Sequence, residues 1–251
     1  MSMTMRRIFL AKRFSAVVTI LFCVYFVKAE TTNALSDAKI QGRDLAQQLR
    51  NAPPAESITN SAVLIIRDAE RHSEKIPVRF QIALMAGEPS GWVADYETTD
   101  TNFIRLTISH AANQPNQYRL QKNGGLADLR GGAEIPFAGS DFWLCDFGLE
   151  FLFWPDQKIL KKEFHDNCAS IVLESRNPHP TANGYARVVS RIEEESGGIM
   201  EAQTYDLTGR QLKDFRVKDL KKVNGHWQVE TVIMENLQTG SKTRLEFDLN
   251  K

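Results

Sequence analysis

Few side chains in this 251-residue sequence are spaced in a way that supports chemistry. The five histidines are scattered along the chain. His165 and Cys168 lie three positions apart, a spacing that can begin a metal site. Two further ligands at a suitable spacing are missing, so a solvated loop is the better interpretation. We therefore predict no metal site.

Two other groups of polar residues have simpler structural explanations. Ser140-Asp141, close to Cys145, could build a nucleophilic centre, but these residue types are also the usual N-caps of helices. Glu193-Glu194-Glu195 could chelate a cation, but it directly precedes Ser196-Gly197-Gly198. That order is more typical of a charged, solvated hairpin turn.

The motifs of common enzyme classes are absent from the sequence. It contains no GxSxG nucleophile elbow, no GxxxxGK[ST] phosphate loop, no GxGxxG dinucleotide fingerprint and no HExxH zinc motif. We therefore predict a protein that is not an enzyme, with no catalytic residues and no cofactor.

The most aromatic stretch of the chain runs from residue 140 to residue 155. Ser140 or Asp141 can cap a helix that Pro155 stops, so the pattern predicts one helix over residues 140–154. Its large apolar side chains fall on every side of such a helix. They are Phe142, Trp143, Phe147, Phe151, Phe153 and Trp154. Either the helix is buried in a core, or it lies against an apolar ligand, and the sequence leaves both interpretations open.

The amino terminus has the layout of a secretory signal peptide. Basic residues precede an apolar run from Phe14 to Val27, and Val27-Lys28-Ala29 suits cleavage before Glu30. The run is shorter than the roughly 20 residues that a membrane-spanning helix needs, although an uncleaved anchor is the alternative. Arg6-Arg7 is also compatible with the twin-arginine route. We expect a signal peptide over residues 1–29 and export to the bacterial periplasm.

The charge balance excludes a general affinity for nucleic acid. Removal of residues 1–29 takes away five of the 31 basic residues and none of the 31 acidic ones, which leaves a net charge of −5. A mildly acidic protein has no extended positive field to attract phosphate backbones.

Most of the remaining chain has the two-residue alternation of half-buried strands. In the last strand, Leu245 and Phe247 alternate with charged neighbours, and turn dipeptides such as Asn224-Gly225 separate successive strands. Residues 123–139 are glycine-rich and predict a long loop. The predicted strands are 61–67, 77–85, 92–98, 103–109, 168–175, 185–193, 199–206, 212–220, 227–234 and a final one over about 243–249.

This pattern predicts a mainly β fold with a few helices. A sheet of so many antiparallel strands curls because twist accumulates from strand to strand. We expect a strongly curved antiparallel sheet, or half-open β-barrel, forming a single domain over residues 30–251. An amphipathic helix over residues 33–51 and the aromatic helix are available to cover its open side.

Two cysteines, Cys145 and Cys168, remain outside the signal peptide. An even number of cysteines in an oxidising compartment is compatible with a disulfide. The alternative is two separate buried thiols, because free cysteine is common in protein cores. We expect the disulfide.

Four motifs over residues 137–249 resemble the outer-membrane lipoprotein-sorting (LolA-like) family. The segment Phe137–Phe142 is similar to the family's GSDF element, and Cys168–Ser175 followed by Pro178 is similar to its cysteine-bearing strand. The segment Tyr205–Lys213 resembles its YD..G...K hairpin, and Asn236–Thr243 resembles its penultimate turn.

The resemblance implies a half-open barrel with a helical lid over an apolar cavity, and a function in carrying acyl chains. The expected partners are lipid or lipoprotein acyl chains, together with inner- or outer-membrane components of a lipoprotein export system. The alternative from another class is an envelope sensor or structural module that uses the same fold to recognise a protein.

The expected ligand site combines the aromatic segment with inward-facing strand residues. Phe142, Trp143, Phe147, Phe151 and Trp154 should form or border the lid. Wall or core positions beneath it are expected at Trp227, Val229, Ile233, Leu245 and Phe247.

Overall fold

The structure is a computed structural model that describes residues 37–54, 56–85, 91–129, 132–166, 168–223 and 226–249. The chain divides into two compact units, Met1–Asp37 and Ala38–Lys251. The predicted signal peptide and its cleavage site, and the Asn224-Gly225 turn, lie outside the described residues. The fold described below is that of the second unit.

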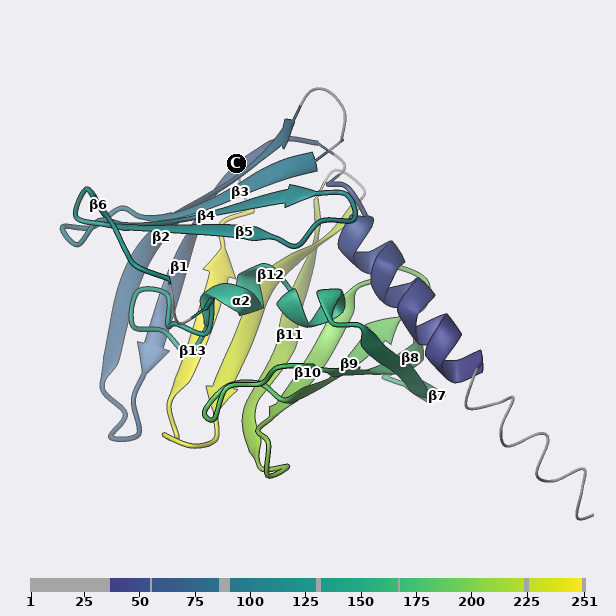
Figure 1. The fold of residues 1–251 in the computed structure, drawn as a ribbon. Coiled ribbons are helices and arrows are strands. Elements are labelled where there is room, and N and C mark those ends of the chain that lie inside the picture. The colour runs from purple at the N-terminus through teal and green to yellow at the C-terminus, as the bar shows by residue number, and fades with distance from the viewer. Residues whose placement is uncertain are drawn as a thin grey trace, which may run out of the picture. The chain divides into compact units, whose positions relative to one another are not determined.

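Thirteen antiparallel strands of the described residues form one curved sheet that does not close (Figure 1). The first six are β1 (Ile58–Arg67), β2 (Ser73–Met85), β3 (Gly91–Thr98), β4 (Ile104–Ala111), β5 (Gln117–Lys122) and β6 (Gly125–Leu126). The other seven are β7 (Asp156–His165), β8 (Cys168–Arg176), β9 (Arg187–Glu193), β10 (Ile199–Tyr205), β11 (Gln211–Val223), β12 (His226–Asn236) and β13 (Lys242–Phe247). The predicted fold class is confirmed.

The strand order explains why one segment must lie across the open side of the sheet. Strands β1 to β6 and β7 to β13 form two meanders that are joined by pairing of β1 with β13. This order places β6 and β7 at the two opposite edges of the sheet. The chain between them, which contains the aromatic stretch, therefore has to cross from one edge to the other.

Alternating burial within the strands follows the predicted pattern where the alternation is regular. In β13, Leu245 is buried whereas Arg244 and Glu246 form an ion pair with each other on the outer face. In β2, Val78 and Phe80 belong to the inner face and are buried. Strands of this kind bury one face and leave the other to water.

Edge strand β7 was not predicted. Its sequence holds three lysines, and its pairing with β8 shifts register between Ile159 and Lys161. A bulge of this kind interrupts the alternation on which the sequence prediction relies. Lysines and bulges are common on edge strands because they discourage pairing with other chains.

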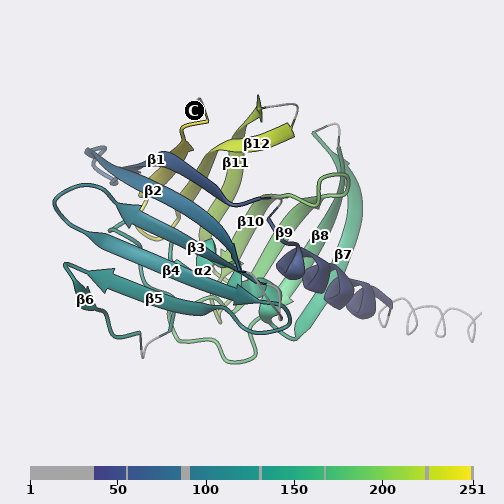
Figure 2. The same cartoon turned by 90° about the horizontal axis from the view of Figure 1, so that it is seen from above.

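A helix of residues 37–51 packs beside β7, as Figure 2 shows. Ala46 is buried in a core cluster that includes Leu173 of β8, and the predicted amphipathic helix is therefore confirmed over its described part. A Cβ atom on Gly42 would lie 2.8 Å from the Cα of Lys158, so this contact between helix and strand requires glycine. No helix among the described residues is long and apolar enough to cross a membrane.

Two clusters of buried side chains fill the inside of the curve. The first contains Leu64, Leu106 and Leu245 from the sheet, and Phe142 and Leu144 from the crossing segment. The second contains residues of β8 to β11 together with three residues of the crossing segment. The crossing segment thus contributes to both cores and fixes the concave side of the sheet.

Candidate functional site

The aromatic segment is not the single helix that the sequence predicts. It forms the four-residue helix α2 (Leu144–Phe147) and then the 3₁₀ turn η1 (Glu150–Phe153). Between them Leu149 adopts a left-handed conformation with φ 47°. Such a conformation is uncommon for residues other than glycine and ends an α-helix. We call residues 141–154 the lid segment.

Asp141, which was expected to cap the helix, binds side chains at the start of β13 instead, and α2 therefore begins later than predicted. The carboxylate of Asp141 accepts hydrogen bonds from the hydroxyls of Ser241 and Thr243, and its backbone N–H donates to the Thr243 hydroxyl at 2.9 Å. Asp141 is therefore an anchor to β13. The N-cap of α2 is Trp143, whose backbone N–H donates to the Asp146 carboxylate at 2.7 Å.

A close contact shortens α2 at its other end. A Cβ atom on Gly148 would lie 2.1 Å from the hydroxyl of Tyr118 on β5, so only glycine permits this approach. The Gly148 carbonyl accepts a hydrogen bond from the Asn116 side chain at 2.7 Å. The chain turns there because strand β5 holds it, and not because the local sequence requires a stop.

An apolar cavity of about 280 Å³ lies between the lid segment and the concave face of the sheet. Its lining comes from Phe142, α2, the Leu149 turn, η1 and the inner faces of six strands. These residues are Tyr96, Phe142, Asp146, Phe147, Leu149, Phe151, Val188, Ile199, Ala202, Thr204, Phe215, Val229, Val232, Met234, Leu245 and Phe247. Asp146 is the one carboxylate in this wall.

Phe147 is the central ring of the lid segment. Its ring lies 4.5 Å from that of Tyr96, 5.4 Å from that of Phe137 and 5.6 Å from that of Phe142, measured between centroids. These separations are within the range of favourable aromatic pairs. Phe147 is only half-buried, whereas Phe142 is buried. Phe147 therefore packs against the core on one side and faces the cavity on the other.

The structure brings together some of the residues expected at the ligand site. Six of them line the cavity: Phe142, Phe147, Phe151, Val229, Leu245 and Phe247. Trp143 is elsewhere, because its ring stacks on Tyr185 at 4.5 Å. Trp154 lines a second cavity, whose wall contains more polar residues than that of the first.

Trp227 and Ile233 were expected at the cavity wall or in the core beneath it, but neither lines the cavity or belongs to a core cluster. Trp227 is 69% exposed near the tip of the β11–β12 hairpin. Ile233 is buried, but it lies opposite Arg216 on the outer face, whereas Val232 and Met234 face the core. The cause is an extra residue in β12, where the pairing register shifts between Asp219 and Leu220 of β11. One extra residue reverses which side chains point inward.

The most unusual group behind the lid segment was missed by the sequence prediction. Lys213 of β11 is 1% exposed. Its Nζ donates to the Asp141 carbonyl at 2.6 Å, lies 3.6 Å from the Asp146 carboxylate, and sits 3.6 Å from the centre of the Trp143 ring. Lys213 is two and four positions from Phe215 and Val217 and therefore shares their face of the strand. A lysine on an otherwise apolar face was the sequence signal that could have identified it.

Burial changes the proton affinities in this cluster. It lowers the pKa of Lys213 from its usual value, although the nearby Asp146 acts in the opposite direction. It raises the pKa of Asp146, against the attraction of Lys213. The pKa of the Tyr185 hydroxyl, which donates to Asp146 at 3.2 Å, is raised for the same reason. For Lys213 and Asp146 the cost of desolvating a charge exceeds the attraction between the two partners, whereas for Tyr185 the negative charge of Asp146 adds to the effect of burial.

The second cavity next to the lid segment has a volume of about 310 Å³. Glu134, Asp146 and Glu150 are among its lining residues. Glu134 accepts from the Thr181 hydroxyl and the Tyr185 backbone N–H, both at 2.8 Å, and Glu150 accepts from the Tyr118 hydroxyl at 2.7 Å. These carboxylates hold loops and strands together, and their bonds account for their presence.

The expected Cys145–Cys168 disulfide is not formed, since both residues are free thiols. Cys145 is buried in the second core cluster, next to Leu173 of β8. Cys168 begins the same strand five residues earlier and therefore points to the opposite face. There its thiol hydrogen-bonds to Glu193.

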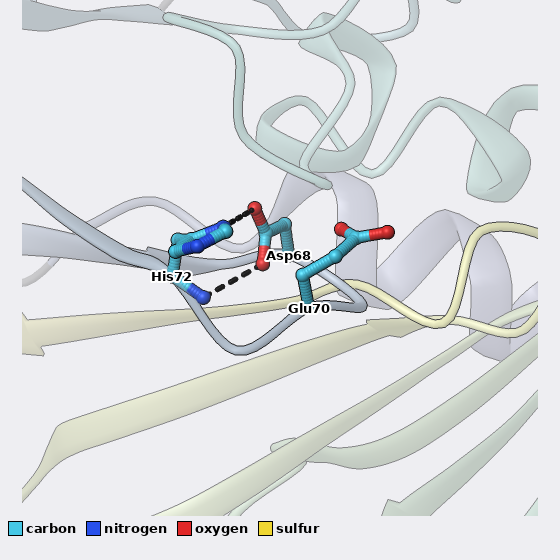
Figure 3. Close-up of side chains that lie close together, drawn as sticks. All are labelled: Asp68, Glu70 and His72. Atoms are coloured by element: carbon cyan, nitrogen blue, oxygen red, sulfur yellow. Dashed lines mark hydrogen bonds and ion pairs between the residues drawn. The ribbon is translucent and has the colours of Figure 1, made fainter.

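A group of potential metal ligands lies on the β1–β2 turn. Asp68, Glu70 and His72 are all exposed and bring their ligand atoms within 4.8 Å of one another (Figure 3). Both carboxylate oxygens of Asp68 already have hydrogen-bond partners in His72. One accepts from the His72 backbone N–H at 2.7 Å, and the other lies 2.9 Å from His72 Nδ1. These bonds stabilise a tight turn, and we assign no ion to it.

Comparison with known proteins agrees with the architecture. A family model described as "Uncharacterized protein" matches residues 130–250, and no match is found among curated proteins. A DUF1329 family protein from Desulfovibrio piger superposes with a TM-score of 0.71 at 17% identity, over 84% of this chain and 91% of that chain.

Two further solved structures share the fold. A domain from Vibrio parahaemolyticus named for outer membrane lipoprotein sorting has a TM-score of 0.67 at 19% identity, over 84% of this chain and 91% of its own. A LolA superfamily protein from Nitrosomonas europaea has a TM-score of 0.51 at 15% identity, with the same coverage of 84% and 91%. The chain has the LolA-like fold, and the resemblance seen in its sequence is confirmed at that level.

Proposed function

We propose that this protein is a non-catalytic carrier that binds the acyl chains of lipidated ligands in the cavity beneath the lid segment. The observation that carries the proposal is the composition of that wall. Of its sixteen lining residues, Asp146 is the one with a side chain normally charged at neutral pH, and Lys213 lies 3.6 Å from it. A dry wall of this kind suits an apolar ligand and offers little to a polar one.

The energetics of acyl chains support the same proposal. Each methylene group transferred out of water contributes about 0.8 kcal/mol, so a carrier needs apolar area more than it needs polar contacts. Aromatic rings such as Phe147 and Phe215 supply large area with few rotatable bonds. The cavity of about 280 Å³ is close to the lower end of the roughly 300–1,000 Å³ that is usual for ligand sites.

The cellular setting belongs to the proposal as well. The signal peptide expected over residues 1–29 would deliver the protein to the bacterial periplasm. Two solved structures with this fold carry names that refer to lipoprotein sorting or to the LolA superfamily. We propose that the ligand is the acyl part of a lipid or lipoprotein, and that membrane components of an export system are its donor and acceptor.

The test is binding of a fluorescent fatty acid to the exported protein and to three variants. Ala202→Leu fills the cavity from the sheet side, and Phe147→Ala removes the central ring of the lid segment. Phe164→Ala, at a residue that is 74% exposed on β7, is the matched control for loss of one phenylalanine. We expect Ala202→Leu and Phe147→Ala to weaken binding by about tenfold, or about 1.4 kcal/mol. Phe164→Ala should leave it unchanged.

Stability measurements on the same variants separate a lid from a core. A fully buried phenylalanine costs about 3–5 kcal/mol when it is replaced by alanine, and half-buried Phe147 should cost less. Equal probe binding by all four proteins, together with a ligand-free native mass spectrum, would contradict the carrier. That result would instead favour the alternative, a module on the same fold that recognises a protein partner.

A further inference from the structure

The concave face carries more apolar surface than the cavity beneath the lid segment uses. A groove with a volume of about 680 Å³, more than twice that of the cavity, lies between the tips of the β9–β10 and β11–β12 hairpins. Its lining residues are Glu193, Ser196, Gly198, Ile199, Met200, Val217, Leu220, Trp227 and Val229. Ile199 and Val229 line both the groove and the cavity, so the two adjoin each other.

Strand register places one row of apolar side chains along both the cavity and the groove. Three successive pairs of opposed residues follow β11 and β12 from the cavity into the groove: Phe215 with Met234, Val217 with Val232, and Leu220 with Val229. The bulge between the last two pairs returns the apolar side chains to the inner face. The next pair toward the hairpin tip on the same face is Lys222 with Trp227. We call the six residues of the first three pairs, together with Trp227, the apolar lane.

The apolar lane is long enough to hold one acyl chain. From Met234 to Trp227 it covers seven residue steps, or about 23 Å at 3.3 Å per residue. An acyl chain in one leaflet extends about 15 Å, half of the hydrocarbon thickness of a bilayer. The cavity alone covers only the part of the lane next to the lid segment.

Exposure is concentrated in the part of the lane beyond the cavity. Trp227 is 69% exposed, Leu220 43% and Val229 37%, although they adjoin each other on one face. The Nζ atom of Lys222 lies 5.9 Å from the centre of the Trp227 ring. If half of a ligand site is unfilled, it should expose a contiguous apolar surface next to the cavity.

We propose that the apolar lane is the distal half of the ligand site, that it holds the methyl end of the acyl chain against Trp227, and that it selects long chains over short ones. This inference rests on the proposed carrier function and adds the class of ligand, a chain longer than the cavity beneath the lid segment. Each methylene group that the lane removes from water should strengthen binding by about fourfold. Discrimination by chain length therefore arises in the groove.

The test compares decanoate with octadecanoate, each carrying bromine at its methyl end as a fluorescence quencher. In the exported protein, the octadecanoate probe should quench the emission of Trp227, and the decanoate probe should not. Subtracting the signal of Trp227→Phe isolates this tryptophan from Trp92, Trp143 and Trp154. Octadecanoate should also bind at least ten times more tightly than decanoate.

Two variants locate the effect. Leu220→Glu puts a charge into the lane and should weaken octadecanoate binding at least tenfold while leaving decanoate binding unchanged. Leu207→Glu, at an exposed leucine of the β10–β11 turn that lines none of the cavities described above, is the matched control and should change neither. Because Leu220 is partly exposed, its substitution should leave the thermal unfolding midpoint close to that of the parent protein.

The outcomes that overturn the inference are distinct from failure of the carrier function. Equal affinity for both chains, or an equal loss for both in Leu220→Glu, overturns the apolar lane and leaves the carrier intact. Quenching of Trp227 by vesicles of brominated phosphatidylcholine, without quenching by the free octadecanoate, overturns it in favour of a membrane contact. Failure of both chains to bind contradicts the carrier itself.

Discussion

Replacement of Lys213 by methionine should be among the most damaging single changes in this protein. The ammonium group is buried, donates to the Asp141 carbonyl at 2.6 Å and lies 3.6 Å from the Asp146 carboxylate. Methionine has nearly the same length and keeps the packing against the Trp143 ring. The change therefore removes the charge and the donor without creating a large hole.

The magnitude follows from what is left behind. Removal of one member of a buried ion pair typically costs about 3–5 kcal/mol, because the other charge remains buried without compensation. Asp146 can limit this cost by binding a proton, and burial already raises its pKa. We therefore expect Lys213→Met to lower the free energy of unfolding by about 3 kcal/mol at pH 7, at the lower end of that range.

The pH dependence of the stability difference provides a second, independent test of the prediction. A group whose folded pKa is raised stabilises the fold fully below its unfolded pKa and loses that contribution as the pH rises through the folded pKa. Without Lys213, the pKa of Asp146 should rise further. The stability difference between Lys213→Met and the parent protein should therefore shrink as the pH is lowered from 7 toward 5.

The assay is urea unfolding followed by circular dichroism, with a double-mutant cycle. Asp146→Asn alone leaves the ammonium group buried, whereas Lys213→Met with Asp146→Asn removes both charges. The double variant should lose less than the sum of the two single losses, by about 0.5–3 kcal/mol. Lys218→Met, on the same strand with its side chain 47% exposed, is the control and should cost less than about 0.5 kcal/mol.

A loss below about 1 kcal/mol for Lys213→Met, combined with additive effects in the cycle, would refute the reasoning. It would mean that Lys213 is not enclosed with Asp146, and that the lid segment is held only by its apolar contacts and by Asp141. A normal loss with no pH dependence would show that Asp146 does not titrate in the folded protein.

Two further predictions concern the thiols and the acid stability. The exported protein, which is expected to lack residues 1–29 and hence Cys23, should carry two free thiols, at Cys145 and Cys168. Iodoacetamide should alkylate Cys168 before Cys145, because Cys145 is buried and burial raises the pKa of its thiol well above the usual value. A mass two daltons lower than that of the reduced protein would mean a disulfide. The carboxylate of Asp206 accepts hydrogen bonds from the hydroxyl and backbone N–H of Thr208 and from the Arg210 side chain. These bonds lower the pKa of Asp206 from 3.8 to about 2. The stabilisation by Asp206 is therefore present above pH 3.8 and is lost as the pH falls toward 2. Asp206→Asn should therefore lower the thermal midpoint at pH 7 but hardly change it at pH 2, and an equal loss at both values would contradict the assignment.

The sequence was informative wherever one strand alone determines which side chains are buried. The alternation around Leu245 and Phe247 identified the inner face of β13, and the aromatic stretch identified Phe142, Phe147 and Phe151 as residues of the lid segment. These signals are local, because the side-chain period of a strand is set by its backbone. The curled sheet followed from the number of antiparallel strands.

Other features depended on residues far apart in the chain. Asp141 fails to cap a helix because the hydroxyls of Ser241 and Thr243, about a hundred positions later at the start of β13, bind its carboxylate. The inner face of β12 changes at a bulge that its pairing with β11 creates, which moved Ile233 outward and Val232 inward. Neither contact leaves a trace in the neighbouring sequence.

The sequence alone thus determined the alternating strands, the curved antiparallel sheet and the supply of aromatic side chains above it. The tertiary structure decided which of those side chains enclose a cavity, that Cys145 and Cys168 point to opposite faces, and that Lys213 is buried beside Asp146. The physical reason is that periodicity records the solvent exposure of one element at a time. The burial of a charge or the closing of a cavity depends on partners that long-range strand pairing brings together.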